Sequence, residues 1–194
     1  MVLNNLEILK ICPSHFKDIV SLSDEQFGVG YISEEHLKMF FSKKQNDGFV
    51  ALYNQKVVGY VLLKIAHHFL DLESIILKDK EWFKSLFQNN YPVGIIETIV
   101  VDKGYNNRGI GKLLVQDSLN QLKNKTNSVV SFLWQHPNGT PLETLLTKYQ
   151  FKHQKTINNY WLKDSILKNY KCKYCGQPCH CQCMVYYQLF LPDN

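Results

Sequence analysis

Residues Ile95–Leu114 read Ile-Ile-Glu-Thr-Ile-Val-Val-Asp-Lys-Gly-Tyr-Asn-Asn-Arg-Gly-Ile-Gly-Lys-Leu-Leu. An apolar strand that contains one carboxylate, Glu97, leads into a basic turn, two glycines and an amphipathic helix. The first turn of a helix has unpaired N–H groups and the positive end of the helix dipole, so this unit is suited to binding an anion. Gly109 and Gly111 would let a phosphate approach the backbone without hindrance from a Cβ atom. The alternative is an ordinary strand-to-helix turn that uses glycine for its geometry alone.

The glycine spacing excludes two common phosphate-binding motifs. A P-loop has Ser or Thr after its Gly-Lys pair, whereas Leu113 follows Lys112 here. A dinucleotide-binding fingerprint has three glycines, and the third is missing. The segment resembles instead motif A of the GCN5-related N-acetyltransferases (GNAT), written Arg/Gln-x-x-Gly-x-Gly/Ala. The matching residues are Asn106, Asn107, Arg108, Gly109, Ile110 and Gly111, with Asn106 in the usual Arg/Gln position.

This resemblance implies an α/β fold of the GNAT type, with a mixed, mostly antiparallel sheet of about seven strands flanked by helices. The order of elements that we predict along the chain agrees with it. Strands are expected near residues 6–12, 49–53, 57–65, 94–101, 128–134, 151–163 and 184–191. Helices are expected at 13–27, after Ser33, and at 80–88, 109–123 and 141–149. We take residues 1–194 as one domain, in which the resemblance covers about residues 3–165 and the last strand.

Composition narrows the class of protein. Of the 194 residues, 45% are hydrophobic and 13% aromatic, which is enough for one packed domain. The net charge of +5 includes no long basic block, so nucleic acid is not expected as a partner, whereas acidic ligands such as coenzyme A are favoured. No apolar run reaches the roughly 18 residues of a membrane span, and Met1–Leu9 carries no secretory signal. We therefore expect a cytoplasmic protein without a membrane partner, as a monomer or homodimer.

Acetyl transfer to an amine requires a neutral nucleophile. An alkylamine has a pKa near 10, so deprotonating it at pH 7 costs about 4 kcal/mol, and a general base removes this obstacle. Glu97 is the candidate catalytic residue, because a carboxylate inside an apolar strand costs free energy unless it has a function or a partner. We place its side chain on one face with Ile95, Ile99 and Val101. The alternative is a structural carboxylate that a neighbouring Lys or Tyr satisfies.

The resemblance also implies where acetyl-coenzyme A would lie. In this family strands four and five splay, and the pantetheine arm is held between them by main-chain contacts, here from Ile99, Val100 and Val101. An N–H near Val101 would support the thioester oxygen. The pyrophosphate would rest on residues 106–112, where Arg108 and Lys112 add charge. Asn138 matches an Asn that often touches coenzyme A in relatives, although Pro-Asn-Gly also serves a plain turn.

The acid that protonates the leaving thiolate departs from the family pattern. Relatives usually carry a Tyr where this chain has Leu146, and Gln150 replaces the usual Gly. Tyr149 and Tyr160 are nearby substitutes, but both fit a role as core or rim aromatics better. A coenzyme A thiolate has a pKa near that of free Cys, about 8.5, so it can also leave without an acid.

Five of the six cysteines lie between residues 172 and 183. In a reducing compartment such a cluster indicates metal binding before disulfides, although disulfides or free thiols are the alternative. We expect a structural zinc site in a loop over residues 170–184, between strands six and seven, that fixes the rim where acceptors enter this fold. Cys183 is the spare thiol and His180 a weaker candidate; the four expected ligands are Cys172, Cys175, Cys179 and Cys181.

Together these features predict an N-acetyltransferase that moves acetyl from acetyl-coenzyme A to a primary amine by direct attack in a ternary complex. The acceptor stays open between a protein N-terminus, a lysine side chain and a small amine such as a polyamine or an aminoglycoside. The alternative is a zinc-containing module that binds protein or nucleic acid on a catalytically degenerate acetyltransferase scaffold. Weak or absent binding of acetyl-coenzyme A would favour that module.

Overall fold

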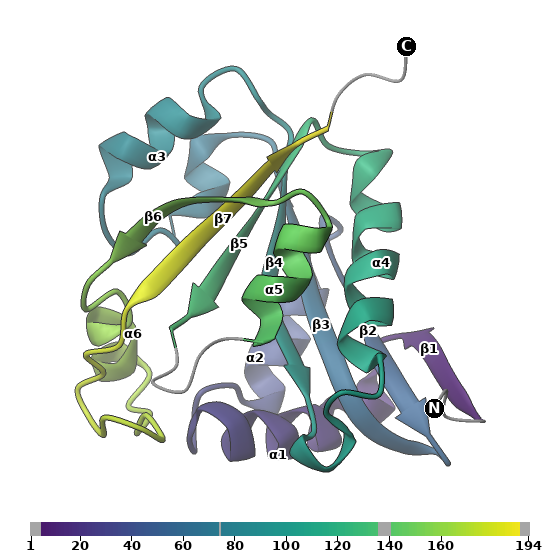
Figure 1. Cartoon of the computed structure of the whole chain (residues 1–194). Helices are drawn as coiled ribbons and strands as arrows, with labels where there is room; N and C mark the ends of the chain where they lie inside the picture. The colour runs from purple at the N-terminus through teal and green to yellow at the C-terminus, as the bar shows by residue number, and fades with distance from the viewer. Residues whose placement is uncertain (1–4, 74, 136–140, 191–194) are drawn as a thin grey trace.

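The computed structural model describes residues 5–73, 75–135 and 141–190, and a sheet with helices on both faces forms its centre (Figure 1). Seven strands lie in the order β1-β2-β3-β4-β5-β7-β6. Within these described strands, β4 and β5 pair in parallel and all other neighbours pair antiparallel. The strands are β1 (Leu6–Lys10), β2 (Asn46–Tyr53), β3 (Lys56–Ala66), β4 (Val93–Val101), β5 (Ser128–Trp134), β6 (Lys152–Ile157) and β7 (Cys183–Leu189).

Helices cover the sheet from both sides. In Figure 1, α4 (Ile110–Lys123) and α5 (Pro141–Lys148) lie in front of the sheet, and α1 (Phe16–Phe27) and α2 (Glu34–Phe41) lie behind it. Alternate residues of β3 supply the two cores, because Val61 packs with α4 whereas Tyr60 and Leu62 pack with α1 and α2. The remaining helical segments are η1 (Pro13–His15), η2 (Phe69–Leu72), α3 (Lys80–Phe87), η3 (Lys103–Tyr105) and α6 (Leu162–Leu167).

A bulge interrupts the ladder between β3 and β4. Thr98 pairs with Leu62 and Ile96 pairs with Leu63, so Glu97 between them has no partner residue in β3. A bulge adds a residue to one strand and re-aims the side chains near it. The bulge in β4 therefore decides where the Glu97 carboxylate points.

The bulge corrects the face expected for Glu97. Ile95 packs in the cluster beside α3, but Ile99 and Val101 pack against the cluster beneath α4 on the opposite side. The Glu97 carboxylate contacts Lys64, which pairs across the ladder with Ile95. Glu97 thus shares a face with Ile95, and the expectation that it also shares one with Ile99 and Val101 is wrong.

The parallel strands β4 and β5 pair over only part of their length. Val93–Ile96 lies opposite Ser128–Ser131, and beyond this segment the two strands separate. β4 stays paired with β3, and β5 with β7, along their whole lengths, so the sheet divides into two parts at this point. The expected splay between strands four and five is confirmed.

One expected strand is too long. β6 ends at Ile157, Asn159 adopts a left-handed conformation with φ 51°, and α6 follows where the sequence predicted continued strand. The physical reason is Tyr160, which is fully buried and donates a hydrogen bond from its hydroxyl to the carbonyl of Ile75 at 2.7 Å. The other expected elements are present within three residues of their expected bounds.

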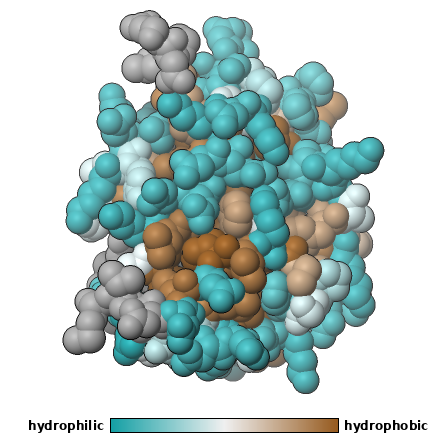
Figure 2. Space-filling model, turned by 90° about the vertical axis from the view of Figure 1, so that its right-hand side faces the viewer, coloured by the Kyte–Doolittle hydropathy of each residue, from teal (hydrophilic) through white to brown (hydrophobic). Residues whose placement is uncertain are grey.

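The side of the molecule that carries β1 and α4 appears in Figure 2. Apolar side chains gather in the lower half of this face, and hydrophilic ones surround them. β1 is an edge strand whose Leu6 and Ile8 are only partly buried against the core beneath α4. Across the described residues, no helix combines the length and apolar character needed to cross a membrane.

Candidate active site

A cavity of about 900 Å³ lies where β4 and β5 separate. On the α4 and α5 side it is lined by the first turn of α4 and by Leu142 and Leu145. On the opposite side it is lined by Phe27 and Tyr31, at and after the end of α1, and by part of the cysteine segment. The cavity therefore extends through the gap in the sheet, with lining residues on both faces.

The first turn of α4 presents its backbone to this cavity. Gly109 precedes the helix with φ +84°, a left-handed conformation that favours glycine, and no side chain caps the helix. A Cβ atom at Gly109 would meet nothing within 4 Å, and one at Gly111 would have contacts no closer than 3.7 Å. The N–H groups of this turn have no acceptor within the helix. The space beside them suits an anionic group.

Most residues expected to hold the coenzyme line the cavity. The expected residues that do so are Ile99, Val100, Val101, Asn106, Asn107, Gly109, Ile110, Gly111 and Lys112. Arg108 is not among the lining residues, because its guanidinium lies over the ring of Tyr105 at 5.4 Å. Lys103 and Lys173 line the cavity as well and add positive charge. Asn138 lies outside the described residues.

Glu97 lines the cavity from the bulge in β4. Its Oε1 and Oε2 atoms lie 3.1 Å and 3.0 Å from Nζ of Lys64, and both side chains are about four-fifths buried. The Lys64 ammonium also lies 5.4 Å from the centre of the Phe40 ring. The carboxylate thus has the lysine partner that a purely structural role would require. It also faces the cavity, as a general base must.

Tyr31 is a cavity residue that the sequence did not indicate. Its phenol lies beside the Thr98 side chain, next to Glu97, and burial raises the pKa of Tyr31, so the phenol stays protonated at neutral pH. Tyr149 and Tyr160 do not line the cavity, in agreement with their expected role as core or rim aromatics. Nothing in the local sequence marks a Tyr after the end of an amphipathic helix as a residue that lines a cavity.

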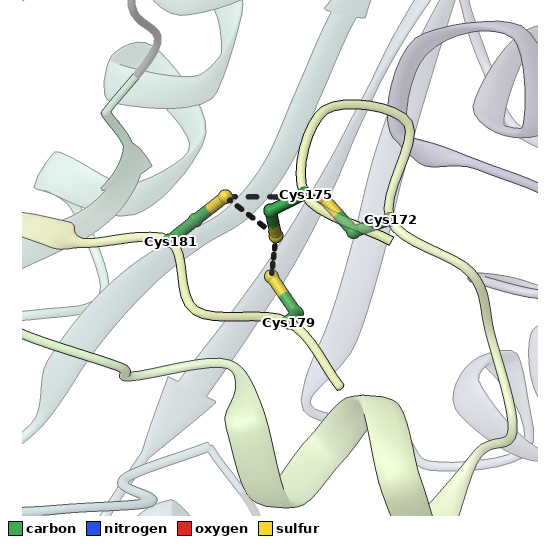
Figure 3. Close-up of side chains that lie close together, drawn as sticks. All are labelled: Cys172, Cys175, Cys179 and Cys181. Atoms are coloured by element: carbon green, nitrogen blue, oxygen red, sulfur yellow. Dashed lines mark hydrogen bonds between the residues drawn. The ribbon is translucent and has the colours of Figure 1, made fainter. Parts of the chain in front are cut away.

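Four cysteine side chains point toward one another in the segment between β6 and β7 (Figure 3). The Sγ atoms of Cys172, Cys175, Cys179 and Cys181 all lie within 4.8 Å of one another. Measured pairs are 3.8 Å for Cys172–Cys181, 3.7 Å for Cys175–Cys179 and 3.4 Å for Cys175–Cys181. These distances exclude a disulfide, whose sulfurs lie about 2.05 Å apart. They match the roughly 3.8 Å edge of a sulfur tetrahedron around zinc, since Zn–S is about 2.3 Å.

Backbone hydrogen bonds fix the loops that carry these sulfurs. Cys172 and Gly176 exchange two N–H···O bonds of 3.0 Å, which close the knuckle, and the Cys175 sulfur accepts from the N–H of His180 at 3.3 Å. Ser165 of α6 accepts the N–H of Cys179 at 2.8 Å. Cys183, the spare thiol, is fully buried in the sheet core instead.

The cysteine segment packs against the end of α1. The Lys173 N–H donates to the carbonyl of Phe27 at 3.0 Å, and the Lys173 ammonium donates to the carbonyl of Glu25. A Cβ atom on Gly28 would lie 1.9 Å from the carbonyl oxygen of Lys171, so the two backbones touch. The cysteine segment therefore packs against the end of α1 and forms part of the cavity wall.

Comparison with known proteins agrees with this geometry. An N-alpha-acetyltransferase of Sulfurisphaera tokodaii is 28% identical over 131 residues, 68% of this chain and 69% of that protein. An N-alpha-acetyltransferase of Saccharolobus solfataricus is 27% identical over the same shares. The crystal structure of Arabidopsis thaliana NAA60 with a bisubstrate analogue has the same fold, with a TM-score of 0.68 at 15% identity over 95% of this chain and 97% of that one. Residues 16–149 match the acetyltransferase (GNAT) family, so this chain belongs to that family and is an acetyl-coenzyme A-dependent N-acetyltransferase.

Proposed function

We propose that this enzyme acetylates the α-amino group of a protein or peptide, with acetyl-coenzyme A entering from the α4 side and the amine from the α1 side. The observation that supports this proposal is the cavity that passes through the sheet, with the α4 first turn at one end and Glu97 near the other. Both curated relatives are N-alpha-acetyltransferases, which favours an N-terminal amine over the other acceptors.

The coenzyme would be bound mainly by backbone groups. The free N–H groups at Gly109, Ile110 and Gly111 suit the pyrophosphate, and Lys112 adds a side-chain charge. In the gap between the strands, the main chain of Ile99–Val101 has no partner in β5, and this side of it suits the pantetheine arm and the thioester oxygen. Asn106, which occupies the usual Arg/Gln position, would not prevent coenzyme binding, because backbone groups would make the contacts with the pyrophosphate.

Glu97 would act as the general base. It takes one proton from the acceptor ammonium, directly or through a water, and the neutral amine then bonds to the acetyl carbon. As the C–S bond breaks, the nitrogen releases its second proton to solvent. Lys64 holds the carboxylate in an ion pair at the edge of the cavity before the acceptor arrives. The coenzyme thiolate takes up a proton from solvent, which its pKa of about 8.5 permits without a dedicated acid.

We further propose that Cys172, Cys175, Cys179 and Cys181 hold one structural zinc ion. The sulfur separations fit a four-thiolate tetrahedron, which leaves no position open for catalysis. When bound, the metal would cross-link the two halves of the cysteine segment. It would thereby stabilise the cavity wall beside Phe27. Purified protein is expected to release one equivalent of zinc on denaturation, and its absence would contradict the assignment.

Two measurements test the enzymatic proposal. Calorimetry should show binding of acetyl-coenzyme A, and Glu97→Gln should lower kcat about 10²- to 10⁴-fold while leaving that binding unchanged. Glu81→Gln, an exposed carboxylate on α3 far from the cavity, is the matched control and should behave as the native enzyme. Equal activity of the two variants would remove Glu97 from the mechanism, and a protein that binds no acetyl-coenzyme A would refute the proposed function.

A further inference from the structure

Six aromatic side chains line the amine-facing half of the cavity, and we call them the aromatic wall. They are Phe27, Tyr31, Trp134, Trp161, Tyr170 and Tyr174. Five of these rings form a continuous chain of contacts. Ring centres lie 5.4 Å apart for Tyr170–Tyr31, 4.5 Å for Tyr31–Phe27, 5.7 Å for Phe27–Trp134 and 5.0 Å for Trp134–Tyr174. Trp161 packs against the same cluster.

The charges around the cavity exclude one class of acceptor. Among the described residues that line it, Glu97 is the one carboxylate, whereas Lys103, Lys112 and Lys173 contribute cations. A polyamine or an aminoglycoside carries several ammonium groups and requires several acidic partners. One carboxylate is enough for a single amine, so the remainder of the acceptor meets rings and cations rather than acids.

We propose that the aromatic wall is a subsite that selects peptides whose N-terminal residue has a large apolar side chain, of the size of Met, Leu or Phe. The inference rests on the proposed transfer to an α-amine and adds the substrate class. With the amine at Glu97, the first side chain is the group nearest the rings of Phe27 and Tyr31. Burying a large apolar side chain against such rings is favourable, whereas a Ser or Gly would leave the rings in contact with water.

Half of this wall lies outside the residues that match the family. Trp161, Tyr170 and Tyr174 lie beyond residue 149, where the match to the family ends, and Tyr170 and Tyr174 flank the first ligand of the cysteine cluster. Phe27 and Tyr31 approach from the α1 side and contact the cysteine segment through Trp134 and Tyr170. The preference therefore depends on two segments that the tertiary structure brings together.

The test is a panel of peptides that are identical except for the first residue. Met-, Leu- and Phe-peptides should be acetylated with kcat/KM at least about tenfold above Ser- and Glu-peptides, the size expected for a large side chain in an apolar pocket. Spermidine, and a lysine peptide with a blocked N-terminus, should be poorer acceptors still. Equal rates across the first residues, or a faster reaction with spermidine, would overturn the subsite while leaving the acetyltransferase activity in place.

Two variants connect the preference to the rings. Tyr174→Ser on the cysteine segment and Phe27→Ala at the end of α1 should each reduce the ratio of Met-peptide to Ser-peptide rates severalfold, with unchanged affinity for acetyl-coenzyme A. Leu70→Ser, which removes an exposed apolar side chain away from the cavity, is the control and should keep the native ratio. Zinc content and melting temperature show whether each variant is folded. Folded ring variants with the native ratio would refute the inference, whereas loss of acetyl-coenzyme A binding by the native protein would refute the proposed function.

Discussion

Replacing Gly28 with Ala tests whether the cysteine segment is locked to the end of α1. Gly28 ends α1 with φ 119° and ψ 153°, a region that side-chain-bearing residues avoid. The added Cβ atom would lie 1.9 Å from the carbonyl oxygen of Lys171 and 3.2 Å from the backbone N of Lys173. Both contacts are with backbone, so no side-chain rotation relieves them, and one of the two segments must move.

The cost of this substitution follows from three contributions. The strained conformation costs about 1–3 kcal/mol. Separating the segments also breaks the hydrogen bond from the Lys173 N–H to the Phe27 carbonyl, worth about 1 kcal/mol. The ring contact between Tyr31 and Tyr170 across the same junction weakens with it. We expect a loss of about 2–4 kcal/mol in the free energy of unfolding, which for a chain of this size lowers the Tm by roughly 5–15 °C.

Calorimetric melting of Gly28→Ala measures this loss. Gly104→Ala is the matched control, because Gly104 has an ordinary φ and its added Cβ would come no closer than 3.4 Å, to the Asp102 side chain. The KM for the peptide acceptor should rise in Gly28→Ala while the Kd for acetyl-coenzyme A stays constant. A Tm within one or two degrees of the control would show that the cysteine segment does not rest on α1 as described.

Three further predictions concern the coenzyme end, the metal and pH. Gly109→Ala, at φ +84°, should weaken acetyl-coenzyme A binding at least severalfold by calorimetry and lower the Tm by only a few degrees, because its Cβ meets no protein atom. Cys175→Ser should abolish stoichiometric zinc and raise the acceptor KM more than the Kd for acetyl-coenzyme A, and zinc content equal to the native protein would contradict this. Burial, followed by the charge of Lys168, lowers the pKa of His36, so its contribution to stability is complete above about pH 6.5 and declines as the pH falls below that value. In urea unfolding, His36→Gln should therefore lose less stability than the native protein between pH 7 and 5.5, and parallel losses would refute the assignment.

The sequence predicted those parts of the site that depend on local signals. The turn at Gly109–Gly111 needs glycine for its conformation and a free helix end for its chemistry, and both requirements are visible in a short stretch. The same holds for the four cysteines, because a knuckle requires its two thiols at a fixed short spacing, and the structure brings together the four that spacing had selected. β5 and the hairpin of β2 and β3 could be predicted for the same reason, since apolar runs bounded by turn residues specify them.

Features that depend on pairing between distant segments could not be predicted in this way. The β4 bulge arises from the register between Thr98 and Leu62, and no pattern within β4 itself gives that register. A partner for Glu97 was expected only as some Lys or Tyr, because Lys64 reaches it across the ladder from another strand. The aromatic wall is a more distant case, as its rings come from α1, β5 and the segment after β6.

The two ends of the cavity are built by different parts of the chain, and this division has a kinetic consequence. The proposed coenzyme end comes from β4, α4 and α5, all within the residues that match the family, and it would depend mainly on backbone groups that tolerate changes of side chain. The proposed acceptor end combines Phe27, Tyr31 and Trp134 with side chains that lie beyond residue 149, in α6's N-terminal flank and the cysteine segment. Because Tyr170 and Tyr174 belong to the proposed acceptor end, replacing them should alter the KM of the acceptor more than the Kd of the coenzyme. An acetyltransferase scaffold can in this way keep one donor and change its acceptor by rebuilding the segment between β6 and β7.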